Sequence, residues 1–196
     1  DRLVGLPVPS VPLERLDIGT ARLALAAVTP APTCIGAMDD AALPLTSALA
    51  AEQGQPHWAV AAVARSSSNK AQMRRHQAAC GVPVPRFRIE PRLDRDVIAE
   101  AIAEMGPVVI KPAQGEFSQG VQYLETADTF CELAYDNCIT NARRAGYNIN
   151  NAEWLIEAYV DGAMYSAEGV SLDGEVHILG RVANEMGPLP TFEMVG

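Results

Sequence analysis

The spacing of apolar residues changes along this chain, and that change limits the folds open to it more than any other feature. In the middle of the chain, apolar residues recur at helical spacing, as in "VIAEAIAEMG" over residues 97–106. Near the end, the segments "WLIEAYV", "MYSAEGVSL" and "EVHILGRV" alternate in the manner of strands. Asp161-Gly162 and Asp173-Gly174 lie between these segments and are typical of hairpin turns. The last third therefore predicts a three-stranded antiparallel meander.

Helices and strands alternate before that point. Residues 70–80 predict a helix with N-cap candidates in Ser66–Asn69, closed by Gly81 ahead of an extended, proline-containing exit. A second helix in "LDRDVIAEAIAEMG" precedes the strand "PVVIKP", and a glycine loop separates that strand from a short one, "VQYLE". The segment "TADTFCELAYDNCITNARRAG" predicts a helix with one apolar face, made by Phe130, Leu133, Ala134 and Cys138.

The N-terminal part is organised differently. "LVGLPVPSVPL" predicts extended, proline-punctuated chain. In "TCIGAMDDAALPLTSALAAEQG", a strand-like piece at Cys34 and Ile35 precedes a capping Asp pair, a helix from Leu43 to Ala51 and a stop at Gly54. This order is typical of the last strand–helix step of an α/β layer.

The expected fold class is therefore mixed, α/β and α+β. Residues 1–64 predict the trailing part of an α/β layer, residues 65–155 a small α+β lobe, and residues 156–196 the start of a second, antiparallel lobe. The chain begins without Met and ends on "TFEMVG" in mid-element, so we expect a piece of a longer protein.

Composition excludes some classes of function. With 15 Lys and Arg against 24 Asp and Glu, the net charge is −9, which argues against a general nucleic-acid or membrane-surface binder. The 4 cysteines form no C-x-x-C pair and have no histidine at ligand spacing, which predicts free thiols rather than a zinc site. No leader or membrane-length apolar run occurs, so the expected location is the cytoplasm.

Lys111 is the residue that most clearly indicates chemistry. It shares one face of the strand "VVIKP" with Val109, and a lysine there is costly to bury unless an anion meets it. The alternative is an edge-strand lysine whose stem covers apolar surface while its ammonium stays in water. The loop that follows favours an anion site, because Gly115 and Gly120 let backbone N–H groups approach a polyphosphate and Ser118 adds a hydroxyl.

Three common nucleotide sites do not match. The glycine loop follows the lysine strand, whereas it precedes that strand in protein kinases, and neither H-R-D nor D-F-G occurs. The chain also lacks G-x-x-x-x-G-K-[ST] and a helix-opening G-x-G-x-x-G.

Three segments in order resemble the ATP-grasp carboxylate–amine ligases: "NKAQMRRHQAACGVPVPRF", "PVVIKPAQGEFSQGV" and "WLIEAYVDGAMYSAEGVSLDGEV". The resemblance begins at about Ile35, where "DDAALPLTSALAAEQG" is similar to the end of the Rossmann-like domain that precedes the grasp fold. It implies that ATP lies between two lobes, that Lys70 and Lys111 neutralise its phosphates, and that the loop from Gly115 to Gly120, with Ser118, closes over them. It also implies that backbone groups of Glu157 and Val160 bind the adenine edge.

The sequence departs from the family pattern in several places. Met164 stands where the family often has an acidic residue for the ribose, and Glu168 is the candidate substitute. Phe117 replaces a small loop residue. The Mg²⁺ ligands of the family lie on later strands, so we expect the metal ligands beyond residue 196, none within this chain, and no turnover by these residues alone.

The resemblance implies a function. We expect a ligase that forms an amide from a small acid, such as an amino acid, and an amine through an acyl phosphate. The cofactors implied are ATP and Mg²⁺, the partners are the two small-molecule substrates rather than nucleic acid or membrane, and a homo-oligomer is compatible. Two alternatives stay open: a non-catalytic nucleotide-binding regulatory or assembly module, and a carboxylase-type enzyme that uses bicarbonate.

Overall fold

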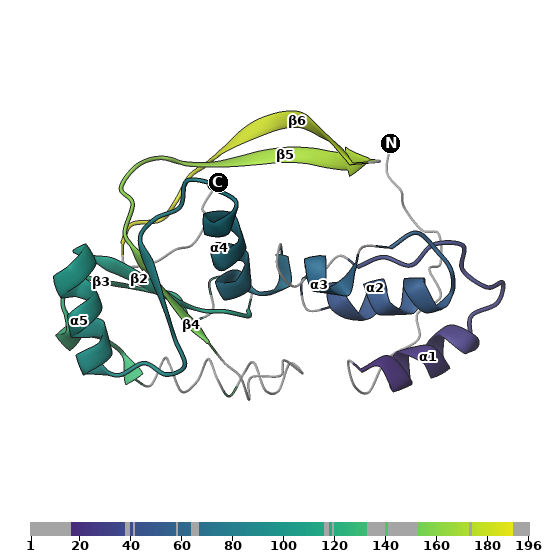
Figure 1. The fold of residues 1–196 in the computed structure, drawn as a ribbon, viewed down its shortest axis with the longest axis horizontal. Helices are drawn as coiled ribbons and strands as arrows, with labels where there is room; N and C mark the ends of the chain where they lie inside the picture. The colour runs from purple at the N-terminus through teal and green to yellow at the C-terminus, as the bar shows by residue number, and fades with distance from the viewer. Residues whose placement is uncertain are drawn as a thin grey trace. The chain divides into compact units, whose positions relative to one another are not determined.

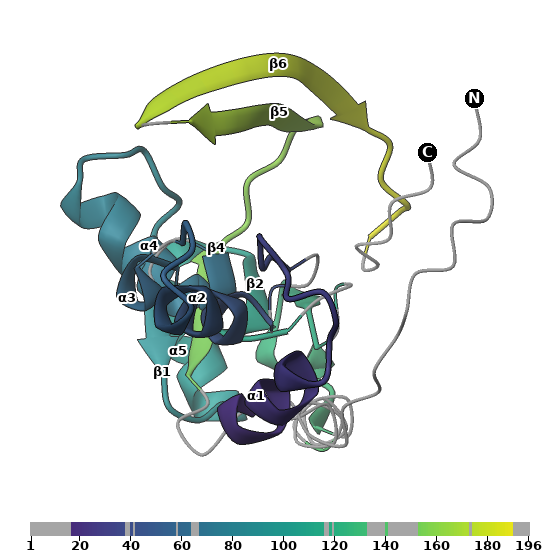
Figure 2. The same cartoon turned by 90° about the vertical axis from the view of Figure 1, so that its right-hand side faces the viewer.

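A computed structural model describes residues 17–37, 40, 42–57, 59–63, 67–115, 118, 120–132, 140, 153–172 and 174–189. The chain divides into two compact units, Asp1–Asn69 and Lys70–Gly196, and Figures 1 and 2 together label their α-helices and strands. Each unit is considered by itself below. The predicted segment "LVGLPVPSVPL" lies outside the described residues.

The regular elements described in the first unit are helices. They are α1 (Ile18–Ala26), α2 (Leu43–Glu52) and the single turn α3 (Val60–Val63). Asp17 caps α1 by accepting from the Thr20 N–H at 3.0 Å, and a two-bond contact from Arg22 to Glu52 joins α1 to α2. The predicted helix 43–51 is thus confirmed, whereas α1 was not predicted.

The predicted strand at Cys34 and Ile35 is wrong. Residues 34–37 have no regular secondary structure, and no strand of the described first unit pairs with them. A strand needs a partner for its backbone groups, and the nearby Pro30 and Pro32 carry no N–H to give one.

The second unit is built around a four-stranded antiparallel sheet with the order β1-β4-β2-β3. Its strands are β1 (Phe87–Glu90), β2 (Val108–Pro112), β3 (Gln122–Leu124) and β4 (Trp154–Ala158). The predicted strands "PVVIKP" and "VQYLE" are confirmed as β2 and β3, while β1 was not predicted. Two inner strands, β2 and β4, therefore lie between the edge strands β1 and β3.

The two faces of this sheet meet different helices. On one face, α5 (Arg95–Met105) packs Ile98, Ala101 and Met105 into the main core. The strand residues of that core are Val108, Ile110, Leu124, Trp154 and Ile156. On the other face, α4 (Lys70–Ala79) contacts β4, and its Ala71 is fully buried. Both helices confirm the sequence prediction, including the end of α4 before Gly81.

The predicted three-stranded meander is wrong in one strand. β5 (Met164–Leu172) and β6 (Glu175–Asn184) form a separate two-stranded hairpin, whereas β4 pairs with β1 and β2. Figure 2 shows β5 and β6 side by side. The physical reason is that β4 is buried on both faces, as an inner strand is, and residues 159–163 give the chain enough length to change sheets.

The β5–β6 hairpin is exposed over nearly its whole length. It bulges between Glu168 and Gly169, where a Cβ on Gly169 would lie 2.6 Å from the His177 carbonyl oxygen, so only glycine fits. Of the turn predicted at Asp173-Gly174, the first residue lies outside the described part.

Of the predicted helix over 126–146, the structure describes residues 126–132 and 140, and Glu132 and Thr140 are helical. At its start, Ala127–Thr129 form a 3₁₀ turn (η2) and Phe130 is buried in the core. Leu133, Ala134 and Cys138 lie outside the described residues. Among the helices that are described, none combines the length and apolar character needed to cross a membrane.

Candidate functional site

Lys111 lies on an inner strand and its side chain is mostly shielded from solvent. Val108 and Ile110 point to the α5 core and are fully buried, so Lys111 and Val109 occupy the opposite face, which α4 covers. β3 pairs with β2 only as far as Ile110, and Lys111 pairs with Leu155 of β4. The side chain of Lys111 is 22% exposed and its ammonium contacts Glu157. This is not the water-exposed ammonium of the edge-strand alternative.

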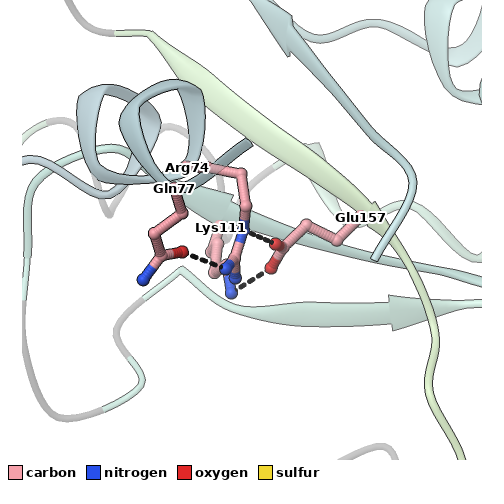
Figure 3. A network of polar contacts seen from close by, with 4 residues as sticks. All are labelled: Arg74, Gln77, Lys111 and Glu157. Carbon is pink, nitrogen blue, oxygen red and sulfur yellow. Dashed lines mark hydrogen bonds and ion pairs between the residues drawn. The ribbon is translucent and has the colours of Figure 1, made fainter. Parts of the chain in front are cut away.

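Glu157 is the anion that meets Lys111 in the structure. It lies on β4 opposite Val109, so its side chain shares the face of Lys111, two residues away across the strand pair. Its Oε2 contacts the Lys111 Nζ, and its Oε1 accepts from the Arg74 Nε at 2.5 Å (Figure 3). Glu157 is only 5% exposed. The carboxylate is therefore buried and uses each oxygen for one cation.

Arg74 comes from α4 and is held by a second contact. Its Nη1 donates to the Gln77 Oε1 at 2.7 Å, three residues further along the same helix (Figure 3). Lys70, one turn before Arg74, begins α4: its backbone N–H donates to the Ala113 carbonyl at 2.7 Å and its Nζ to the Gly115 carbonyl at 2.5 Å. Helix α4 thus places Lys70 beside the residues that follow β2 and Arg74 beside Glu157.

We call Lys70, Arg74, Lys111 and Glu157 the cation cluster. Arg74 and Lys111 share the one carboxylate of Glu157, so this contact leaves an excess of one positive charge. That excess stands out in a chain of net charge −9. Partial burial strengthens the attraction of such charges for an anion, because the effective dielectric constant is lower than in water.

The loop after β2 has backbone conformations that favour close approach. Gly115 has φ 139°, a value that residues with a Cβ rarely adopt, and Gly120 has φ 72°. Ser118 is exposed and has φ 55°, and its carbonyl accepts from the Val121 N–H at 3.1 Å. Phe117 lies outside the described residues. The loop therefore starts at the carbonyl that Lys70 contacts and turns back within a few residues.

The structure places the remaining predicted residues elsewhere. The backbone of Glu157 lies inside the sheet, opposite Phe87 and Val109, so Glu157 joins the cation cluster through its side chain. Val160 follows β4 and is 66% exposed. Glu168 lies on β5 at the bulge and is exposed, and no contact in the described part of the chain joins it to the cation cluster.

Sequence reasoning missed Arg74 and Gln77. The signal was present in the spacing, because Lys70, Arg74 and Gln77 follow one another at intervals of four and three residues on one helical face. A glutamate inside the apolar run "WLIEAYV" was the second signal.

Two further observations bear on ligands. A cavity of about 580 Å³ lies along the edge strand β3, lined by Tyr123, Cys131 and Leu189 among others, and none of its described lining residues belongs to the cation cluster. In the described ranges, no group of three or more His, Cys, Asp or Glu residues is arranged to hold a metal ion.

Comparison with known proteins identifies the fold. Residues 104–192 match the family model of the ATP-grasp domain. The described architecture is that of a partial ATP-grasp fold. The mixed α/β elements and antiparallel sheets agree with that assignment and confirm the fold class predicted from the sequence.

Solved structures with this fold resemble most of the chain. An L-amino acid ligase from Bacillus licheniformis matches with a TM-score of 0.69 and 20% identity over 90% of this chain. The biotin carboxylase of Campylobacter jejuni matches with a TM-score of 0.65 and 19% identity over 88% of this chain. At these identities the likeness establishes the fold alone.

The chain is short relative to its matches. It spans 41% of the ligase and 39% of the carboxylase. An uncharacterized protein of Sinorhizobium fredii (strain NBRC 101917 / NGR234), y4rH, is 35% identical over 127 residues, which is 63% of this chain and 24% of that protein. Activity, substrates and partners of the whole protein are therefore proposals.

Proposed function

We propose that the protein is an ATP-dependent ligase that joins the carboxylate of an amino acid or similar small acid to an amine, with release of ADP and phosphate. The observation that carries the proposal is the environment of Lys111. Its ammonium lies on an inner strand of an ATP-grasp fold, largely shielded from solvent, beside Arg74 and before a glycine loop.

The residues present fit a nucleotide polyphosphate. Two cations of the cluster share one carboxylate, and Gly115 has φ 139°, which lets the backbone of the loop approach an anion closely. Lys70 and Lys111 would hold the phosphates, with Gly115, Ser118 and Gly120 forming the closing loop. Backbone groups of the segment from Glu157 to Val160, where the chain leaves β4, would hold the adenine, and Glu168 the ribose.

The proposed reaction has two balanced steps. A carboxylate oxygen attacks the γ-phosphorus of ATP, the bond from that phosphorus to the bridging oxygen breaks, and ADP leaves. The amine nitrogen then attacks the acyl carbon, phosphate leaves with the electron pair, and the nitrogen loses a proton. This chain's cations orient the phosphates and screen the charge on the oxygens, which contributes much of the rate in phosphoryl transfer. Mg²⁺, when bound, would add positive charge to the phosphates.

A second candidate function has support from one comparison. The fold is also similar to that of a biotin carboxylase, which favours testing bicarbonate in place of an amino acid as the acid. Cytoplasmic location and assembly into a homo-oligomer stay predictions from the sequence.

ADP release by the complete natural chain tests the proposal. The assay contains ATP and Mg²⁺ with pooled amino acids in one arm and bicarbonate in another. We expect release in the amino-acid arm and a loss of about 100-fold or more in Lys111→Ala, because a positioned charge on the reacting phosphates is removed. Arg75→Ala is the control, since Arg75 is an exposed cation on the same helix and pairs with Glu153.

The outcomes separate the candidates. Near-normal release by Lys111→Ala would contradict the phosphate role. Release that depends on bicarbonate alone would favour the carboxylase. ATP binding that requires Lys111 without ADP release in either arm would favour the non-catalytic nucleotide-binding module.

A further inference from the structure

We propose that Arg74 is a positioning residue that lets Lys111 leave Glu157 when a polyphosphate binds. The inference rests on the proposed nucleotide binding by Lys111 and goes beyond it, because it assigns a role to a contact between protein groups. In the structure, the Lys111 ammonium is already occupied by Glu157. A phosphate must therefore take Lys111 from a carboxylate that is in place beforehand.

The burial of Glu157 makes that exchange difficult unless a second partner stays. The side chain of Glu157 is 6% exposed, so little water can replace a lost cation. A buried carboxylate without a partner is strongly destabilised. If Lys111 were its only partner, the carboxylate would resist the release of Lys111, and binding of an anion would be weakened by that cost.

Arg74 supplies the partner that stays. It donates to Glu157 Oε1, while Lys111 contacts the other oxygen, Oε2, so the two cations do not compete for one atom (Figure 3). When Lys111 turns to a phosphate, the Arg74–Glu157 pair is left as a neutral unit. The burial of the charge on Glu157 is then compensated both before and after binding.

The geometry also indicates which of the two cations moves. The side chain of Arg74 is 15% exposed, and its Nη1 is fixed by the Gln77 Oε1. The side chain of Lys111 is 22% exposed, and the chain from Lys111 leads within four residues to Gly115, where the glycine loop begins. A planar guanidinium held at two points keeps its orientation, whereas an ammonium on a four-carbon stem can turn to a new anion.

Nucleotide binding by a set of variants tests the inference. The affinity of the complete natural chain for ADP is measured by titration calorimetry, for wild type, Arg74→Met, Glu157→Gln and the double variant. Met keeps the length of the arginine stem without its charge. Arg74→Lys restores the charge, and Arg75→Met is the matched control, because Arg75 neighbours Arg74 on α4 and pairs with Glu153 where both side chains are more exposed.

We expect Glu157→Gln to restore most of the ADP affinity that Arg74→Met removes. We expect Arg74→Met to weaken ADP binding about tenfold, which corresponds to about 1.4 kcal/mol. In the Glu157→Gln background we expect the same change to weaken binding by about twofold at most, because no carboxylate then holds Lys111. Glu157→Gln alone is expected to bind ADP at least as tightly as wild type, Arg74→Lys to recover most of the affinity, and Arg75→Met to match wild type.

Each other outcome speaks against the inference. If Arg74→Met weakens binding equally in both backgrounds, Arg74 acts directly on the nucleotide or on the helix, and the inference fails. Affinity of Arg74→Met equal to wild type also overturns it. If Arg74 only stabilised the fold, the double variant would still bind ADP weakly, and thermal unfolding of the same samples would show its lower stability. Failure of the proposed function looks different: ADP then binds neither wild type nor Glu157→Gln, or binds Lys111→Met as well as wild type.

Discussion

Removing the carboxylate of Glu157 is expected to destabilise the protein more than removing either of its cations. In Glu157→Met, the charges of Arg74 and Lys111 lose their common partner in a mostly buried place. Breaking a fully buried pair costs about 3–5 kcal/mol. Because the side chains of Arg74 and Lys111 are 15% and 22% exposed, water can take up part of the loss, and we expect about 2–3 kcal/mol here.

The matched comparisons make this estimate testable. In Lys111→Met, Glu157 keeps Arg74, so we expect a smaller loss of about 1–2 kcal/mol. In the exposed pair Arg75–Glu153 the side chains are 51% and 30% exposed, and Glu153→Met is expected to change stability by less than about 1 kcal/mol.

Urea unfolding at equilibrium, followed by tryptophan fluorescence, measures these differences. Trp154 is 1% exposed and lies on β4 three residues before Glu157, so its emission responds to loss of this sheet. With a slope of about 1–3 kcal/mol per molar urea, the expected loss for Glu157→Met lowers the midpoint by about 0.7–3 M. A midpoint for Glu157→Met no lower than that of Glu153→Met would refute the reasoning.

Two further predictions concern the loop and the first unit. Gly115→Ala is expected to destabilise the protein by about 1–2 kcal/mol, because φ is 139° at Gly115. Gly36→Ala is the control: nothing lies within 4 Å of its added Cβ, and we expect its stability to change by less than about 0.5 kcal/mol. Equal urea midpoints for the two variants would contradict the strain argument. The hydrogen bond from Arg22 lowers the pKa of Glu52, so Arg22→Gln is expected to raise that pKa toward its ordinary value in an NMR titration. Because folding lowers the pKa of Glu52, its contribution to stability is present above the unfolded-state pKa and is lost as pH falls through the folded-state value. An unchanged pKa of Glu52 in Arg22→Gln would show that Arg22 is not the cause of the shift.

The sequence predicted correctly those helices and strands whose formation depends mainly on neighbouring residues. Helix α5 follows from its apolar spacing and the stop at Gly106, and β2 follows from "VVIK" bounded by prolines. Lys111 was predicted as unusual for the same reason, because its neighbours on the strand are apolar. Asp17, the cap of α1, is the kind of signal that was available but not used.

What could not be predicted is pairing between distant segments. The alternation of "WLIEAYV" indicates a strand but does not identify its neighbours, and β4 pairs with β1, more than sixty residues earlier, rather than with β5. The contact between Arg74 and Glu157 joins residues 83 positions apart, and it depends on α4 covering the face of β4 that holds Glu157. Neither fact follows from the spacing within one element.

The cation cluster combines two requirements that oppose each other. A lysine that is to act on a polyphosphate gains most when it is shielded from water, but a shielded ammonium without a counter-charge destabilises the ligand-free protein. Glu157 compensates Lys111 in that state, and a carboxylate held by Lys111 alone would keep it from the ligand. A second cation on the other carboxylate oxygen removes this conflict, because the pair Arg74–Glu157 remains neutral whichever partner Lys111 has. On the proposed role, this is why two cations share one internal carboxylate, and the charge on Arg74 is expected to matter to binding only while Glu157 is a carboxylate.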